Sequence, residues 1–149
     1  MREITHEEYK NHAQRWIRSL VASLDANLPD EINAEVLEAC GRACARGDGV
    51  SPAQQCQGDL QRYLEMMRIW QGSPEMVRQD GNVVTILCQD CVCPLVQEEA
   101  SGLSGTYCAC SVGWFKENFE TVCQGPVEVE LIETVRRGGK RCHFRVIVA

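Results

Sequence analysis

The sequence predicts an α+β fold, in which N-terminal helices pack on a twisted antiparallel sheet of hairpins and one further helix lies between the hairpins. Apolar residues recur at steps of three and four over residues 5–71, as in amphipathic helices. Two pairs of alternating runs between residues 76 and 148 flank Asp-Gly or Gly-Gly, which are hairpin turns. We expect residues 1–149 to be a single domain, with a helical part (1–72) and a part (73–149) that holds the sheet, a cysteine-rich loop and the further helix.

The first helix is expected over residues 5–27. Thr5 and Glu8 have the spacing of a capping box, in which each side chain accepts a hydrogen bond from the backbone of the other. An apolar stripe follows that we expect to face the core, and Pro29 ends the helix. The stripe consists of Tyr9, Ala13, Trp16, Ile17, Leu20, Val21 and Leu24.

Two more helices are predicted before residue 72. Asp30 begins the second, in which Cys40 and Cys44 lie on the apolar face. We interpret these two cysteines as small apolar core residues, and a metal or reactive pair is the alternative. Ser51 and Pro52 begin the third helix, which is expected to run unbroken to about Gln71.

The first hairpin is predicted around Asp80-Gly81, with strands over 76–79 and 82–88. From Gln89 to Tyr107 the sequence shows little periodicity, and we expect a long loop. Such loops are uncommon inside a compact domain unless they have a function. A metal bound at both ends would account for this one, because closing a long loop removes entropy from the unfolded chain.

The helix between the hairpins is predicted over residues 112–123, with Ser111 as its cap. Cys110 would then stand immediately before a helix N-terminus. The partial positive charge there favours the thiolate over the thiol.

The last hairpin is predicted from strands over 127–135 and 142–148 around Gly138-Gly139. If Arg137 opposes Lys140, Glu133 falls opposite Phe144. Glu133 and Cys142 then point toward one apolar face, while His143 points away. A carboxylate on an apolar face needs a partner, which would be a metal, a bound ligand or an arginine. A one-residue bulge would reverse this assignment.

Charge and composition exclude several partners. The formal net charge is −6, and no basic stripe with interleaved aromatic residues is present, so we expect no nucleic-acid partner. No apolar run is long enough to span a membrane, so we expect no membrane partner. The N-terminus has no apolar signal segment, which predicts a cytoplasmic protein with reduced thiols.

Clustered cysteines are the strongest functional signal in the sequence. Six of the ten cysteines lie between residues 88 and 142, and they are the predicted metal ligands: Cys88, Cys91, Cys93, Cys108, Cys110 and Cys142. Cys91, Cys93, Cys108 and Cys110 offer two close pairs of sulfurs, which suits tetrahedral zinc. An iron–sulfur cluster, a dithiol–disulfide switch at Cys88 and Cys91, or inert buried thiols are the alternatives.

Nucleophilic catalysis has less support, because an active cysteine needs a nearby base. His6 and His12 are expected on the polar side of the first helix. His143 follows Cys142, but strand alternation sends the two side chains to opposite faces. The catalytic residues, if any, stay unassigned.

Two motifs near the C-terminus match a known pattern: Cys110-Ser111-Val112-Gly113-Trp114, followed after Gly125-Pro126 by Gly138-Gly139-Lys140-Arg141-Cys142-His143-Phe144. Through them, residues 108–148 resemble the C-terminal part of the 4-vinyl reductase domain family. The resemblance implies a fold similar to the TRAPP trafficking subunits and the haem-based nitric-oxide sensors. It also implies a small apolar or aromatic ligand, bound beside a zinc ion held by cysteines and a glutamate.

By position, Cys108 or Cys110 matches the first family cysteine and Cys142 the last. Leu131 and Thr134 stand where the family has a glutamate and a cysteine, so Cys88, Cys91 and Cys93 are the candidate replacement ligands. We assign ligand binding to Glu133, Trp114 and Phe144. The whole chain also resembles aminothiazoline carboxylate hydrolase-like proteins, a likeness that implies an enzyme.

The sequence thus predicts a small-molecule-binding or sensory domain with a cysteine-bound metal, zinc. The alternatives are a thiol- or metal-dependent hydrolase of a small heterocycle, an iron–sulfur or redox protein, and an interaction domain with inert cysteines. A homodimer is retained among the expected partners.

Overall fold

The computed structural model describes residues 3–91, 93 and 103–149, and for residues 48–51 only the backbone. Residues 92 and 94–102 of the expected loop lie outside the described residues. The helices are α1 (His6–Asn27), α2 (Asp30–Cys44), α3 (Val50–Gln55), α4 (Leu60–Trp70) and α5 (Ala109–Cys123). The strands are β1 (Val77–Asp80), β2 (Val83–Cys88), β3 (Glu128–Glu133) and β4 (Cys142–Ile147).

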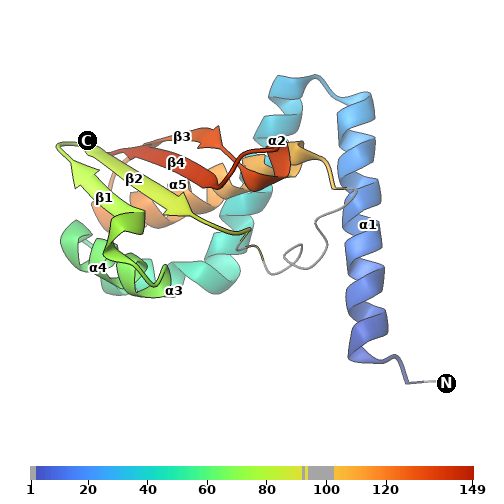
Figure 1. Cartoon of the computed structure of the whole chain (residues 1–149), viewed down its shortest axis with the longest axis horizontal. Coiled ribbons are helices and arrows are strands. Elements are labelled where there is room, and N and C mark those ends of the chain that lie inside the picture. The colour runs from blue at the N-terminus through green and yellow to red at the C-terminus, as the bar shows by residue number, and fades with distance from the viewer. Residues whose placement is uncertain (1–2, 92, 94–102) are drawn as a thin grey trace.

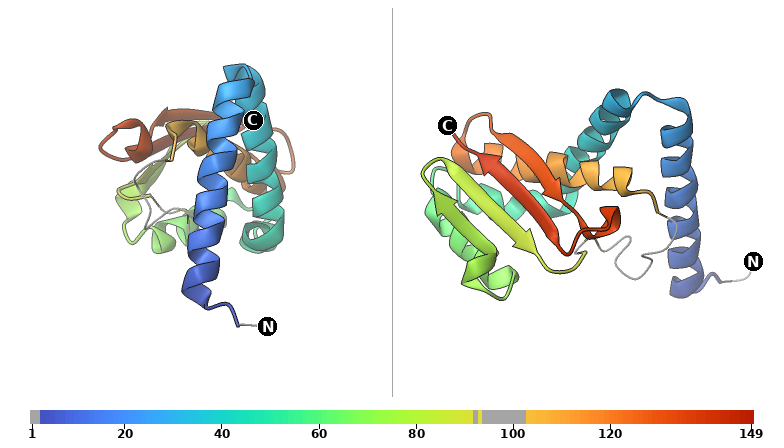
Figure 2. Two further views of the ribbon diagram at one scale, coloured as in Figure 1. Left: turned by 90° about the vertical axis from the view of Figure 1, so that its right-hand side faces the viewer. Right: turned by 45° about the horizontal axis from the view of Figure 1, so that its top comes forward.

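The predicted α+β fold class is confirmed. N-terminal helices precede a four-stranded antiparallel sheet in the order β1-β2-β4-β3, and α5 lies between the two hairpins in sequence. Figures 1 and 2 show α4 and α5 on the same face of the sheet, while α1 stands at the far end of the molecule from the C-terminus.

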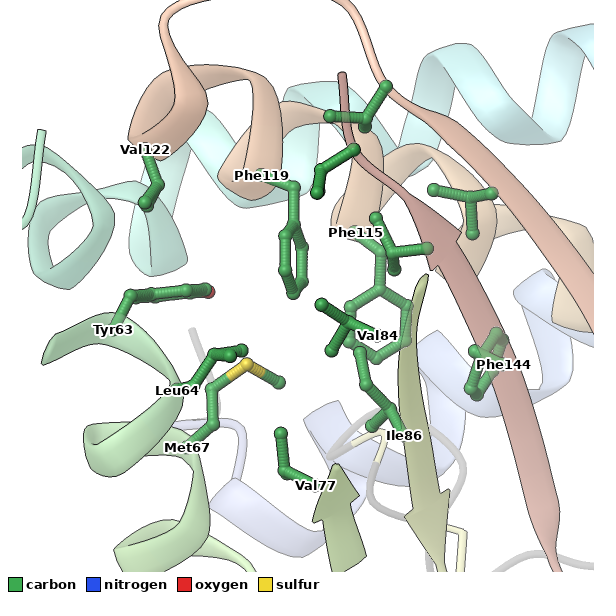
Figure 3. Close-up of a cluster of buried hydrophobic side chains, with 14 of the residues drawn as sticks. Tyr63, Leu64, Met67, Val77, Val84, Ile86, Phe115, Phe119, Val122 and Phe144 are labelled. Atoms are coloured by element: carbon green, nitrogen blue, oxygen red, sulfur yellow. The ribbon is translucent and has the colours of Figure 1, made fainter. Parts of the chain in front are cut away.

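The core lies between the sheet and the helices α4 and α5. Alternate residues of β2 are buried, and Ile86 has no exposed surface. Phe119 of α5 packs edge-on against Tyr63 of α4 with ring centroids 5.5 Å apart. Phe115 packs against Phe144 of β4 at 4.7 Å (Figure 3). The period-2 pattern of the strands therefore places their apolar face against the helices, as predicted.

The first hairpin forms where it was expected, with a shift of one residue. Asp80 pairs with Val83, so the two loop residues are Gly81 and Asn82 rather than Asp80 and Gly81. Gly81 adopts φ +59°, a left-handed conformation that glycine reaches at little cost.

The last hairpin differs from the prediction. A register shift between Leu131 and Glu133 places Glu133 opposite His143, not opposite Phe144. Glu133 therefore does not share the core-facing side of Cys142. A 3-10 turn over Val135–Arg137 replaces the two-residue turn, because the buried Thr134 side chain accepts a hydrogen bond from the amide of Arg137.

Two helix boundaries were also predicted wrongly. The expected third helix is two helices, because Gly58 adopts φ +77° and Asp59 caps a new helix by accepting from the amide of Arg62. The helix α5 begins at Ala109, after a 3-10 turn capped by Ser104. Cys110 therefore lies inside the first turn of α5.

The N-terminal helix forms as predicted, with both hydrogen bonds of the Thr5–Glu8 capping box. Its aromatic stripe is not core, however. Tyr9 is 69% exposed and Trp16 is 60% exposed. The reason is tertiary: α1 stands beside the body of the molecule, and its buried residues are Gln14 and Val21.

Backbones approach closely where α2 crosses α5. A Cβ atom on Gly41 would overlap the carbonyl of Cys110, and one on Gly113 would overlap the carbonyl of Glu38. Only glycine permits such an approach. Across the same crossing, the Arg42 guanidinium donates to Glu120 at 2.7 and 3.1 Å.

Candidate functional site

A pair of cysteines closes the core at one end of the sheet. Cys88, the last residue of β2, lies directly opposite Cys142, the first residue of β4. Opposed residues of an antiparallel pair point to the same face, and this is the core face, since Ile86 and Phe144 are the next pair on it. Gln71 Nε2 donates to Cys88 Sγ at 3.4 Å. Burial raises the pKa of Cys88 to about 11, with further contributions from Cys142 and Cys91.

Two more thiols lie beside this pair. Burial and then the neighbouring thiols Cys108 and Cys91 raise the pKa of Cys142. Burial likewise raises the pKa of Cys108, although a hydrogen bond with Thr134 opposes the rise. Cys88, Cys91, Cys108 and Cys142 thus form one group of interacting thiols, drawn from two strands, the segment after β2 and the turn before α5.

The remaining two predicted ligands belong to a neighbouring group. Cys93 Sγ lies 3.4 Å from the Tyr107 hydroxyl. Burial raises the pKa of Cys110 to about 12, and Cys93, Cys108 and, from α2, Cys44 add to the rise. The prediction that the helix N-terminus would favour a Cys110 thiolate is therefore wrong, because desolvation outweighs the helix dipole at this position.

An apolar cluster packs against two of the thiols on the side of α1. Val21 and Leu103 are its buried members, and Cys91, Cys93 and Tyr107 pack against it. This packing leaves Cys91 and Cys93 half-buried.

The six cysteines do not form a coordination shell as they lie. Among the described residues, no three His, Cys, Asp or Glu side chains are close enough together to hold a metal ion. The fold gathers the six predicted sulfurs into one region, and metal binding would require side-chain rotation within it.

The predicted ligand-binding residues are not brought together. The Glu133 carboxylate accepts from the Lys140 amide at 2.8 Å and lines an open surface depression of about 270 Å³. Phe144 is buried in the core, and Trp114 packs edge-on against Phe115. Neither aromatic residue lines that depression.

Sequence reasoning missed several polar neighbours of the thiols. Tyr107, Thr134 and Gln71 each interact with a clustered cysteine. The position of Tyr107 next to Cys108 was a usable signal. Nothing local indicated Gln71, which reaches Cys88 from just beyond the end of α4.

Fold and site together define an α+β domain with a thiol cluster at one end of its sheet. A model of a family of unknown function, DUF6144, matches residues 2–149, and the chain belongs to this family. No curated protein matches the sequence. Among the described residues, no helix has the length and apolar character needed to cross a membrane.

Proposed function

We propose that this chain is a metal-binding domain in which Cys88, Cys91, Cys108 and Cys142 hold a zinc ion. The observation that carries the proposal is that Cys88 and Cys142 oppose each other at the core-facing end of the β2–β4 pair, with Cys91 and Cys108 as electrostatic neighbours of Cys142. Sulfurs in a tetrahedral zinc shell lie roughly 3.8 Å apart, since each Zn–S bond is about 2.3 Å. Opposed Cβ atoms in a sheet are about 4.5–5.5 Å apart, so rotation about χ1 is enough to bring two sulfurs to that separation.

Zinc binding would displace the protons of these thiols. Burial raises the pKa of Cys88, Cys108 and Cys142, so the metal-free thiols are protonated near neutral pH. A bound zinc ion supplies the positive charge that stabilises thiolates. Cys93 and Cys110 stand next to this set as an alternative pair of ligands.

For the wider role, we propose a cytoplasmic small-molecule-binding or sensory domain with a small apolar or aromatic ligand. The resemblance of residues 108–148 to the 4-vinyl reductase domain family supports this role. Trp114 is the aromatic ligand-binding candidate that keeps part of its side chain at the surface. The likeness to aminothiazoline carboxylate hydrolase-like proteins supports a hydrolase as the alternative.

One observation favours a second candidate, a dithiol redox protein. Directly opposed cysteines such as Cys88 and Cys142 have Cα atoms about 4.5–5.5 Å apart, within the range of a disulfide. Their oxidation would form one S–S bond and pass two electrons and two protons to a small-molecule disulfide, which is reduced to two thiols.

Metal analysis of protein purified without oxygen or chelator distinguishes these functions. We expect one zinc ion per chain, no visible absorbance, and loss of the metal in Cys142→Ser. Cys123→Ser is the matched control, because Cys123 is also half-buried but lies at the far end of α5. A brown protein with iron and sulfide would instead indicate an iron–sulfur cluster. A metal-free protein with ten titratable thiols would refute the zinc site.

A further inference from the structure

The N-terminal hairpin of α1 and α2 carries an exposed apolar surface that the thiol site does not explain. On α1, Tyr9, Trp16 and Leu20 are 69%, 60% and 41% exposed. Their spacings of seven and four residues place them on one face of the helix. On α2, Ile32 and Val36 are 44% and 37% exposed and also share a face.

The other described residues leave much of α1 uncovered. This helix has 22 residues and so is about 33 Å long. Figures 1 and 2 show its N-terminal turns extending beyond the other elements. A helix in a protein gains most of its stability from packing an amphipathic face, and part of the apolar face of α1 has nothing packed on it within the described residues.

The exposed area suits a protein interface. A fully buried aromatic side chain covers about 150–250 Å², so Tyr9 and Trp16 together leave on the order of 200–300 Å² uncovered. A standard interface buries about 800 Å² per partner, of which a little over half is apolar. The two aromatic residues alone would supply roughly half of that apolar area.

Charged residues of opposite sign are exposed on the two helices. On α1, Arg15 lies about 100° around the helix from Trp16, so it can pair with a partner only at the rim of the stripe; on α2, Glu31 and Glu35 are exposed beside the Ile32–Val36 face. We propose that the α1–α2 hairpin is the interface of a homodimer, in which the apolar stripe of α1 packs against the stripe of α2 in a second copy of this chain. Two-fold symmetry forms each contact twice, including the pairing of Arg15 with Glu35.

A membrane surface fits the same face less well than a second copy of the chain. Helices that lie on membranes have basic polar faces that are attracted to anionic lipids. Here acidic residues flank the α2 stripe, and the chain carries a net charge of −6.

Sedimentation equilibrium across a range of protein concentrations tests the dimer. We expect wild type to dimerise and Trp16→Glu to raise the dissociation constant by about 30-fold, the loss typical of an interface hot spot. Ile69→Glu is the matched control, because Ile69 is 76% exposed on α4, outside the hairpin, and its substitution should leave the dimer intact. Far-ultraviolet circular dichroism checks that each variant keeps its helices, and Tyr9→Lys replaces Trp16→Glu if that variant unfolds.

Charge reversal tests the pairing of α1 with α2. Arg15→Glu should weaken the dimer, and the double variant Arg15→Glu/Glu35→Arg should restore it. A monomeric wild type at every concentration, or a dimer that Trp16→Glu leaves unchanged, would overturn the proposal. Failure of the double variant to recover would overturn the α1–α2 pairing. None of these outcomes depends on the thiol site.

Discussion

Two helices that adjoin α2 are held in contrasting ways. The helix α5 crosses α2 at backbone contact, through Gly41 and Gly113, and buries Phe115 and Phe119 in the core. The helix α1 is longer, yet among the described residues its apolar contact with the body is the small cluster around Val21 and Leu103, and Asp25 adds a hydrogen bond from Asn33. Helix length therefore says little about attachment. How tightly a helix is held depends instead on small residues that permit close approach of the backbones and on large residues that are buried in the core.

We expect the largest loss of stability from a substitution at the α2–α5 crossing. Gly113→Ala should destabilise the protein by about 1–3 kcal/mol, because the added methyl would overlap the Glu38 carbonyl and force the helices apart. Denaturant unfolding followed by circular dichroism measures it. Gly125→Ala is the control, since a Cβ there meets nothing within 4 Å. Equal stability of the two variants would contradict a tight crossing.

A substitution in the contact that holds α1 should cause a smaller loss of stability, confined to that helix. Val21→Ala removes two buried methylene equivalents and should cost about 1.6 kcal/mol. Because α1 is held by a separate cluster, we expect faster amide hydrogen exchange in α1 with little change in β2 and β4. The control is Ser23→Ala, at an exposed position of the same helix. Uniformly faster exchange in the whole domain would show that α1 and the body unfold as one unit.

Removal of the ion pair between Arg42 and Glu120, across the α2–α5 crossing, should cause the smallest loss of stability, and this loss should depend on pH. The Arg42 guanidinium lowers the pKa of Glu120 from its ordinary value of 4.5. A carboxylate with a lowered pKa stabilises the fold above its ordinary pKa, and this contribution disappears as the pH falls through the lowered value. Glu120→Gln should therefore cost about 1 kcal/mol at neutral pH, since the pair is partly exposed.

The difference between wild type and Glu120→Gln should vanish in acid, because the wild-type carboxyl is then protonated. Unfolding curves at neutral pH and at a pH below the lowered pKa of Glu120 measure this. Glu65→Gln is the control, because Glu65 is exposed on α4. A difference that persists in acid would mean that the carboxylate charge contributes nothing.

Local sequence signals predicted the elements that depend on local chemistry. The capping box at Thr5 and Glu8 forms because all of its partners lie within one helical turn. The strands around Gly81 were predictable because alternation and turn residues are read over a few positions. The break at Gly58 and Asp59 carried a local signal too, but the apolar stripe that continues through it concealed the break.

The candidate site was only partly predictable. The spacing of the six clustered cysteines indicated a site, and the fold places all of them at one end of the sheet. Which thiols are neighbours depended on strand pairing: Cys88 faces Cys142 because β2 and β4, which are far apart in sequence, are adjacent. The bulge before Glu133 moved that carboxylate away from the cysteines, and a bulge is set by packing rather than by alternation.

The sequence by itself determined the fold class, the capped first helix and the clustering of cysteines, since these follow from periodicity, turn chemistry and spacing. The tertiary structure alone decided three other features: the aromatic stripe of α1 lies at the surface, the thiol of Cys110 is held protonated, and α2 meets α5 at backbone contact. Each of these depends on which distant segment occupies the neighbouring space. Burial, desolvation and close approach are properties of that neighbour as much as of the residue itself.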